Sequence, residues 1–198
     1  MFAENEFVYL SDQNDRKHWL KVSYSMIRLP SLGVIDGSRF RDLDDGSSLE
    51  IAGKRFTVFR PGTMELIESL ERGAQIITPK DASTILLYSD IKAGDTVIEV
   101  GAGSGALTTA LLRAVSSNGR VLTLELKQEN ADRALRNLKR TGLEGNWTCK
   151  MGDAREADVG DIVADALIMD MPDPENALDN LLPHLRAGGR EILPKEGT

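Results

Sequence analysis

The sequence is poor in residues on which several classes of protein depend. A single cysteine, Cys149, among 198 residues rules out an internal disulfide and favours a reducing compartment. The two histidines, His18 and His184, have no cysteine or paired acid at metal-ligand spacing, so no metal site is expected. No stretch reaches the roughly 18 apolar residues of a membrane span, and the amino-terminal residues lack the pattern of a secretory signal. We therefore expect a cytoplasmic protein.

An excess of positive charge is also absent. The formal net charge is -7 and the sequence pI is about 5.0. This balance argues against a protein that wraps nucleic acid through bulk electrostatic attraction. The negative charge is unevenly spread, because residues 1–80 carry 11 basic and 12 acidic side chains, which leaves -6 for residues 81–198. The first segment therefore repels a polyanion less than the rest of the chain.

The pattern of predicted secondary structure changes near residue 70. Hydrophobic residues make up 41% of the chain and charged residues 28%, as in ordinary globular proteins. Residues 1–70 consist of short extended segments separated by turns, and "SLEIAGKRFTVF" predicts a hairpin around Ala52, Gly53 and Lys54. We expect residues 1–70 to form a small β-rich domain and residues 71–198 to form a second domain.

The second segment alternates apolar strand patterns with helical patterns, which is typical of an α/β fold with a parallel sheet. The expected strands are 96–100, 121–126, 146–151, 166–170 and 190–193. The expected helices are 81–89, 104–115, 128–141 and 174–185. Such a sheet binds ligands outside the carboxyl ends of its strands, which places the candidate site at residues 99–105, 125, 152–153 and 170–174.

A glycine-rich loop, "EVGAGSGAL" at residues 99–107, follows the first strand of this segment. A strand-to-helix turn that needs positive φ would account for glycine there. The alternation of Gly101, Gly103 and Gly105, with Ser104 between the last two, favours close approach of a ligand to backbone N–H groups and a helix N-terminus. The loop also fits the dinucleotide pattern G-x-G-x-x-G/A through Ala106, so the glycines alone do not identify the cofactor.

Acidic residues at the strand ends favour one cofactor. Glu99 would repel a pyrophosphate but can accept a hydrogen bond from an ammonium group, which favours S-adenosylmethionine over a nicotinamide dinucleotide. Glu125 ends the next strand, 20 residues after Gly105, where a carboxylate binds ribose hydroxyls, although a surface acid is the alternative. Asp153 in "GDAR" is expected either to meet the adenine amino group or only to form a turn.

Longer segments carry a resemblance to a known family. "ERGAQIITPKDASTILLYSDIKAGDTVIEVGAGSGALT" and "DALIMDMPDPENAL" resemble the tRNA (adenine-58-N1)-methyltransferase family, in particular its archaeal and bacterial branch. The similarity extends from about residue 25 to residue 190 and includes "GVIDG" and "FRPGTMELIESLERGAQII". It implies a Rossmann-like class I methyltransferase sheet with a small N-terminal β-rich domain. The family continues through two further antiparallel strands after "RAGGR", so we expect the C-terminal strands of that fold to be missing here.

The resemblance also implies roles for single residues. Asp170, in the sequence "DMPDP", would lie beside the cofactor and face the target adenine. Adenine N1 has its own lone pair, so a carboxylate that accepts the N6–H bond needs only to orient the ring and stabilise the developing positive charge. Capping of a helix that starts at Pro174 is the alternative interpretation. Gln75 matches the family segment that covers the cofactor and base, whereas Thr78 occupies a place where many relatives carry an aromatic residue.

The expected macromolecular partner is tRNA, and the resemblance implies a homotetramer. A basic group in the first domain is the best candidate for an RNA surface: Arg28, Arg39, Arg41, Lys54, Arg55 and Arg60. Two alternatives stay open, a class I methyltransferase with a small-molecule substrate of the precorrin type and a non-catalytic tRNA-binding subunit. The retained Glu99, glycines, Glu125 and Asp170 disfavour the second, because a non-catalytic partner in this family loses the cofactor motif.

Overall fold

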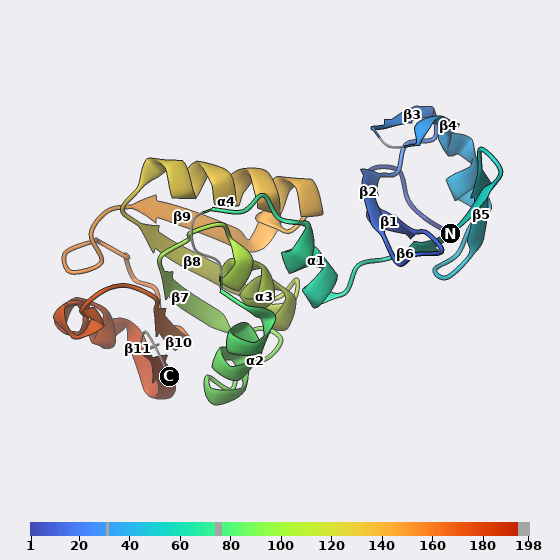
Figure 1. Cartoon of the computed structure of the whole chain (residues 1–198). Helices are drawn as coiled ribbons and strands as arrows, with labels where there is room; N and C mark the ends of the chain where they lie inside the picture. The colour runs from blue at the N-terminus through green and yellow to red at the C-terminus, as the bar shows by residue number, and fades with distance from the viewer. Residues whose placement is uncertain (31, 74–76, 194–198) are drawn as a thin grey trace. The chain divides into compact units, whose positions relative to one another are not determined.

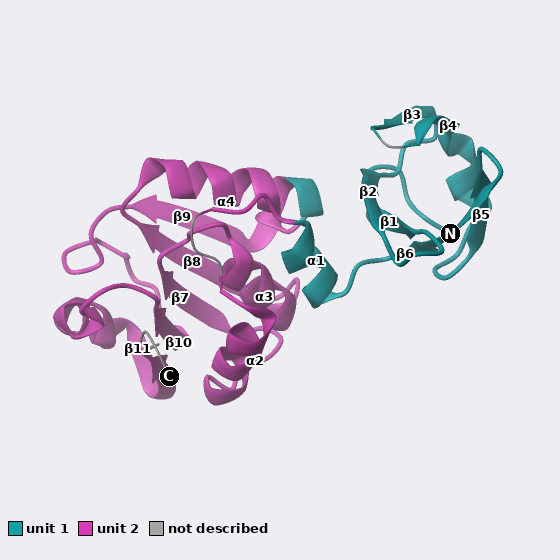
Figure 2. Ribbon diagram, viewed as in Figure 1, with its two compact units in different colours: residues 1–69, 140–142 teal, residues 70–139, 143–198 magenta. Residues whose placement is uncertain are grey.

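The computed structural model describes residues 1–30, 32–73 and 77–193 (Figure 1). The chain divides into two compact units, residues 1–69 with 140–142 and residues 70–139 with 143–198 (Figure 2). We refer to them as unit 1 and unit 2 and describe each by itself. Within the described residues, no helix has both the length and the apolar character that a membrane span requires.

Unit 1 is built on an antiparallel sheet of four strands in the order β2-β1-β6-β5. Its strands are β1 (Phe7–Ser11), β2 (Lys17–Lys21), β5 (Ser48–Ile51) and β6 (Lys54–Phe59). The unit also contains the hairpin of β3 (Met26–Leu29) and β4 (Gly33–Asp36), the 3-10 helix η1 (Gly37–Asp42) and the helix α1 (Thr63–Ser69). The predicted hairpin is confirmed by the β5–β6 pairing, and its two-residue turn places Ala52 at φ 49° and Gly53 at φ 74°.

Alternation along these strands gives unit 1 its own hydrophobic core. Val8 and Leu10 of β1 and Phe56 and Val58 of β6 are almost completely buried, while the residues between them are partly exposed. One face of the sheet therefore packs inward, as the period of two in the sequence requires. Phe2 and Phe40 join this core with their rings in edge-to-face contact at 6.4 Å between centroids.

Unit 2 contains a parallel sheet whose five strands, among the described residues, follow the order β11-β10-β7-β8-β9. The strands are β7 (Thr96–Val100), β8 (Arg120–Glu125), β9 (Trp147–Met151), β10 (Ala164–Met169) and β11 (Leu185–Ile192). The helices are α2 (Pro79–Tyr88), α3 (Ala106–Val115), α4 (Gln128–Thr141) and α5 (Leu178–Leu181), with 3-10 turns η2 (Glu144–Asn146), η3 (Pro174–Ala177) and η4 (Leu182–His184). The expected α/β class is confirmed.

The strand order reverses at β7, because β8 lies on one side of it and β10 on the other. Ligands of open α/β sheets bind at this switch point, outside the carboxyl ends of the two strands. The glycine loop follows β7 and the "DMPDP" sequence follows β10, so both lie at this point. The topology thus brings together two segments that are about 70 residues apart in the chain.

One expected element of unit 2 is wrong, and another is longer than predicted. The helix predicted at 174–185 is a 3-10 turn, a four-residue helix and a second 3-10 turn, because Pro183 inside this range lacks the N–H group that a continuous helix needs. The last strand begins at Leu185 instead of residue 190. The register of its pairing with β10 shifts between Ala164 and Ala166. The glycines of "RAGGR" therefore form an irregularity inside the strand, where Gly188 has φ 75°, and not a loop before the strand.

Candidate functional site

The glycine loop has positive φ at each of its three glycines, 93° at Gly101, 54° at Gly103 and 81° at Gly105. A side chain at Gly101 would place its Cβ 2.7 Å from the carbonyl oxygen of Asp170, and one at Gly105 would place it 3.3 Å from Ala134. A Cβ at Gly103 would meet no described atom within 4 Å. Backbone conformation therefore accounts for all three glycines, and Gly103 in addition leaves open space where a ligand can approach the backbone.

Glu125, at the end of β8, holds this loop in place. Its Oε2 accepts hydrogen bonds from the backbone N–H groups of Ala102 (2.8 Å) and Gly103 (3.3 Å). Its Oε1 accepts one from the N–H group of Lys127 at 2.8 Å. The carboxylate therefore orders the loop in the free protein, a role that the spacing to the glycines did not reveal. The predicted bond to ribose hydroxyls stays a prediction.

Glu99 is completely buried beneath the loop. Its Oε2 accepts hydrogen bonds from the hydroxyl groups of Thr108 on α3 (2.8 Å) and Thr123 on β8 (2.6 Å). Its Oε1 is buried and has no hydrogen-bond partner among the described residues. Burial is the main cause that raises the pKa of Glu99 to about 8; the two hydroxyl donors oppose this shift, and the nearby Asp170 and Glu125 add to it. A cation brought to Oε1 would satisfy that oxygen and favour the ionised form.

Asp170 directly follows β10, and its side chain is exposed. Its backbone N–H donates to the carbonyl of Val100 at 3.1 Å, which fixes it beside the first residue of the glycine loop. The next acid of the sequence, Asp173, has φ 50° and precedes Pro174, which begins η3. Asp173 occupies the N-cap position of η3 without a side-chain capping bond, so the capping interpretation does not apply to Asp170.

The remaining predicted site residues are less informative. Asp153 accepts a hydrogen bond from the N–H of Arg155 at 3.0 Å and forms a turn after β9. Its contact with the adenine amino group stays a prediction. Gln75 lies outside the described residues. Thr78 caps α2, since its hydroxyl accepts from the N–H of Asp81 and donates to the Asp81 carboxylate at 2.6 Å. The sequence "TPKD" carries this capping signal.

Asn137, a buried residue of α4, connects two parts of the site and was missed by sequence reasoning. Its side-chain amide donates to the carbonyls of Glu71 (3.0 Å) and Ser104 (2.9 Å). Its Oδ1 accepts from the N–H of Glu71 at 2.9 Å. The amide therefore ties the glycine loop to the segment that precedes α2. An asparagine amid a basic helical stretch gave no signal of this role.

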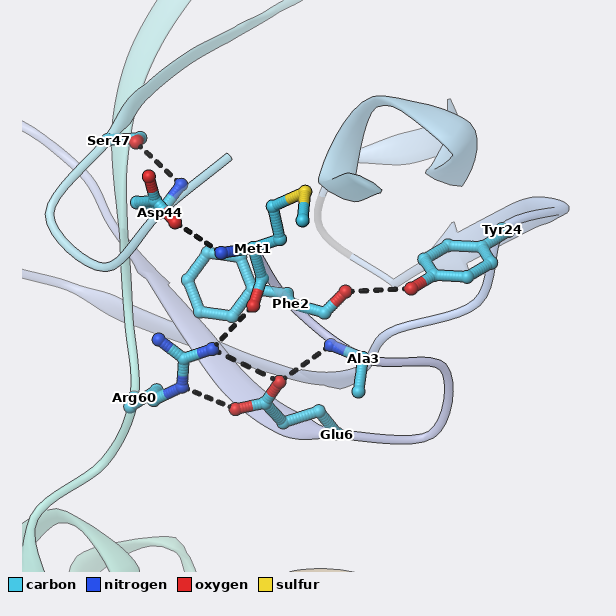
Figure 3. Close-up of polar contacts among 8 residues, drawn as sticks. All are labelled: Met1, Phe2, Ala3, Glu6, Tyr24, Asp44, Ser47 and Arg60. Atoms are coloured by element: carbon cyan, nitrogen blue, oxygen red, sulfur yellow. Dashed lines mark hydrogen bonds and ion pairs between the residues drawn. The ribbon is translucent and has the colours of Figure 1, made fainter. Parts of the chain in front are cut away.

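The basic group predicted in unit 1 separates into engaged and free side chains. Arg60 donates through Nε to Glu6 Oε1 (2.6 Å) and through Nη2 to the carbonyl of Met1 (2.8 Å), and lies over the Phe2 ring at 4.5 Å (Figure 3). Its charge is thus used inside the unit. Arg39 donates to the carbonyl of Glu50, and Arg41 lies over the ring of Tyr24. All six side chains are exposed, and the three without such a contact among the described residues are Arg28, Lys54 and Arg55.

The lesser candidates show no catalytic environment. Burial, together with Glu125 and Glu99, raises the pKa of the Cys149 thiol to about 11, which makes it a poor nucleophile. His18 contacts Asp12 at 3.4 Å, and Nδ1 of His184 lies 3.2 Å from the carbonyl of Ile162. Within the part of the chain that the structure describes, no group of three potential metal ligands occurs.

The donor set fits S-adenosylmethionine. The unpartnered Glu99 Oε1 suits a cationic ammonium group, and the open backbone at Gly103 allows close approach of the ligand. Two further acids, Glu125 and Asp170, lie close enough to raise the pKa of Glu99, and their charges would disfavour a pyrophosphate. The site therefore matches a positively charged nucleoside cofactor better than a dinucleotide.

Comparison with known proteins agrees with this geometry. Residues 58–193 match the family model described as tRNA methyltransferase complex GCD14 subunit. A tRNA (adenine(57)-N(1)/adenine(58)-N(1))-methyltransferase of Methanocaldococcus jannaschii is 30% identical, over 91% of this chain and 70% of that protein. A tRNA (adenine(58)-N(1))-methyltransferase of Thermus thermophilus is 32% identical over 64% of this chain. The chain spans only half the length of the Thermus relative.

Two solved structures cover 98% of the chain. A SAM-dependent O-methyltransferase from Thermotoga maritima matches with a TM-score of 0.78 and 31% identity, over 74% of that chain. The tRNA (m1A58) methyltransferase of Aquifex aeolicus matches with a TM-score of 0.71 and 28% identity, over 77% of that chain. Both matches support the expected Rossmann-like class I methyltransferase sheet with an N-terminal β-rich part.

Proposed function

Since the chain belongs to the tRNA methyltransferase family that the GCD14 model describes, we propose that it methylates N1 of an adenine in the T-loop of tRNA. The observation that carries this proposal is the position of the exposed Asp170 at the switch point, beside the glycine loop. The relatives from Methanocaldococcus and Thermus are named for this reaction, which supports the choice of acceptor.

S-adenosylmethionine supplies an electrophilic methyl group on its sulfonium when it is bound. In this chain Glu99 Oε1 would bind the ammonium group, and the loop of Gly101, Gly103, Ser104 and Gly105 would lie along the amino-acid part. Glu125 would bind the ribose hydroxyls at the end of β8 while it keeps the loop ordered. Asp153 is proposed to contact the adenine amino group. Gln75 is proposed to belong to the segment that covers the cofactor and the base.

Asp170 is the proposed catalytic residue. The lone pair of adenine N1 attacks without a general base, so the carboxylate has to orient the ring and stabilise charge. Accepting a hydrogen bond from the N6 amino group does both, because positive charge spreads over N1 and N6 as the methyl group is transferred. Asp170 is exposed, so a base that has been flipped out of the tRNA fold can approach it.

One observation favours a second candidate function, methyl transfer to an oxygen atom. The Thermotoga structure is described as an O-methyltransferase at an identity similar to that of the tRNA enzymes, so the acceptor atom has to be measured. A precorrin decarboxylase structure is only 22% identical and shares the fold alone. The non-catalytic alternative is disfavoured, because Glu99, the three glycines, Glu125 and Asp170 are all in place at the site.

The test is methylation of a tRNA transcript with labelled S-adenosylmethionine, followed by mass spectrometry of the nucleosides. We expect 1-methyladenosine with the wild type and a kcat lower by about a hundredfold or more with Asp170→Asn. Asp173→Asn is the matched control, since that residue lies in the same loop, is exposed and can keep its positive φ as asparagine. A label found on an oxygen, or equal rates for the wild type and Asp170→Asn, would overturn the proposal.

Binding to tRNA, a homotetrameric assembly and a cytoplasmic location are further parts of this proposal. An assembly would join several copies of the free cations of unit 1, which offsets the low basic charge of one chain. Sedimentation of the purified protein would establish the oligomeric state.

A further inference from the structure

A chain of hydrogen bonds runs from the edge of the sheet to the buried carboxyl of Glu99. Nε1 of Trp147, on the edge strand β9, donates to the hydroxyl oxygen of Thr123 at 2.7 Å. The Thr123 hydroxyl donates in turn to Glu99 Oε2 at 2.6 Å. The same row of the sheet register contains Glu99, Thr123 and Cys149 as direct partners on β7, β8 and β9.

The direction of this chain is set by the chemistry of indole. An indole N–H can only donate, so the Thr123 oxygen must accept from Trp147. A hydroxyl has a single proton, which is then left for Glu99 Oε2. Thr108 adds a second hydroxyl contact to that oxygen at 2.8 Å. Oε2 is therefore the oxygen that accepts hydrogen bonds inside the protein, and Oε1 is the one left for a proton or for a ligand cation.

We infer that Thr123 and Trp147 are positioning residues of the cofactor site, which act through Glu99 by reserving its Oε1 for the ammonium group of the cofactor. This inference rests on the proposed use of S-adenosylmethionine but not on the identity of the methyl acceptor. The titratable groups that face Glu99 from the packed strands are Glu125 on β8, Cys149 on β9 and Asp170 after β10. None of these groups supplies a positive charge, so a cation from the ligand is what the site lacks.

The inference makes a selective prediction about ligands. S-adenosylhomocysteine carries the ammonium group, whereas 5′-methylthioadenosine lacks the whole amino-acid part. In Thr123→Val the donor to Oε2 is lost, so the ionised form of Glu99 is less stable and attracts the ammonium group less well. We expect binding of S-adenosylhomocysteine to the full chain to weaken by about tenfold or more. Binding of 5′-methylthioadenosine should change less than twofold, on the order of measurement error in such titrations.

Two further variants separate positioning from simple damage to the fold. Thr123→Ser keeps the hydroxyl and should restore binding of S-adenosylhomocysteine. Trp147→Phe removes the fixed donor but keeps an aromatic ring, and should weaken only the ammonium-bearing ligand, by a smaller factor than Thr123→Val. Equal losses for both ligands, or no loss for either, would overturn the inference even if Thr123→Val is unstable, because Trp147→Phe carries the same test.

A spectroscopic readout needs no ligand and no tRNA. The sequence has two tryptophans, and Trp19 lies in unit 1, stacked on Phe7 at 5.7 Å between centroids. The indole N–H resonance of Trp147 in a ¹⁵N spectrum should move with pH as Glu99 titrates, while that of Trp19 serves as the internal reference. The movement should disappear in Glu99→Gln and in Thr123→Val. A Trp147 signal that ignores Glu99→Gln would contradict the hydrogen-bond chain, whereas failure of tRNA methylation alone would leave it standing.

Discussion

Glu99 combines complete burial, two hydroxyl contacts to one oxygen and no described partner for the other. An acid in that setting binds its proton more tightly when folded than when unfolded. Its pKa is raised from 4.5 to about 8 in the folded chain. The neutral form of Glu99 therefore predominates in the free protein at neutral pH. Binding of a cationic ligand at this carboxyl group requires that Glu99 release its proton.

The same shift predicts how stability depends on pH. Between pH 4.5 and about 8 the folded chain holds a proton at Glu99 that the unfolded chain has released. The stability that this proton provides is complete below pH 4.5 and is lost as the pH rises through about 8, by at most about 1.4 kcal/mol for each pH unit. In Glu99→Gln this loss is absent, so the free energy of unfolding of the wild type should fall relative to the variant as pH increases.

The measurement is urea unfolding of both proteins at pH 5, 6.5 and 8, followed by fluorescence of Trp147 in a shared Trp19→Phe background. That background confines the signal to unit 2, where Glu99 lies. Parallel stability profiles for the two proteins across this range would show that Glu99 does not hold its proton when folded.

The sequence indicated the acid at position 99 but not its hydroxyl partners. Thr108 and Thr123 stand in the mainly apolar stretches "GALTTALL" and "RVLTLEL", where a threonine by itself does not indicate a site. Their meeting at one carboxyl oxygen depends on the register of β7 with β8 and on the packing of α3. Neither of these is specified by spacing along the chain.

At the scale of elements, α4 does more than cover the sheet. Through Asn137 it makes three hydrogen bonds that join Glu71 to Ser104 of the glycine loop. We predict that Asn137→Ala lowers the free energy of unfolding by about 2 kcal/mol, because buried backbone groups lose their partners. It should also weaken binding of S-adenosylhomocysteine severalfold, since the loop is no longer held on that side.

Asn146→Ala is the control for this prediction. The Asn146 amide likewise donates to two carbonyls, those of Ser116 (3.0 Å) and Gly119 (2.9 Å), but these lie before β8, at the opposite edge of the sheet. Thermal unfolding should detect a loss of stability in both variants, and calorimetry should detect weaker ligand binding only in Asn137→Ala. Equal ligand affinities in the two variants would remove Asn137 from the site.

The elements that were predicted well are those whose periodicity is local. The strands at 96–100 and 121–126 and the helix at 128–141 agree with the structure to within one residue at each end. The region after β10 was predicted poorly, because its boundaries depend on Pro183, on the irregular glycines of β11, and on contacts from outside the segment. Asn180, for example, donates to the carbonyls of Ala154 and Ala157, which pins the short α5 in place.

For the whole molecule, the change of pattern near residue 70 lies next to the division between the two units at Ser69. Composition does not reveal that residues 140–142, at the end of α4 and just beyond it, group with unit 1. Nor does it reveal which cations are already used. Glu6, which binds Arg60, lies 54 positions away in the chain, so the pairing becomes visible only in the folded unit.

The proposed RNA surface of unit 1 therefore reduces to the exposed Arg28, Lys54 and Arg55. We predict that Arg28→Glu combined with Lys54→Glu weakens tRNA binding and lowers the slope of log Kd against log salt by about one to two, as expected for the loss of two phosphate contacts. Binding of S-adenosylhomocysteine should not change, because the residues proposed to bind the cofactor all belong to unit 2.

Arg113→Glu combined with Lys92→Glu is the matched control. It changes the net charge by the same amount, but Arg113 lies in the last turn of α3 and Lys92 precedes β7, so both lie away from the carboxyl ends of the strands. Filter binding of tRNA over a series of salt concentrations distinguishes the two pairs. If both pairs lower the affinity and the salt slope equally, then tRNA binding depends only on the net charge of the chain. In that case unit 1 provides no specific surface for RNA. A loss confined to the first pair means that unit 1 binds the RNA backbone while unit 2 carries the chemistry.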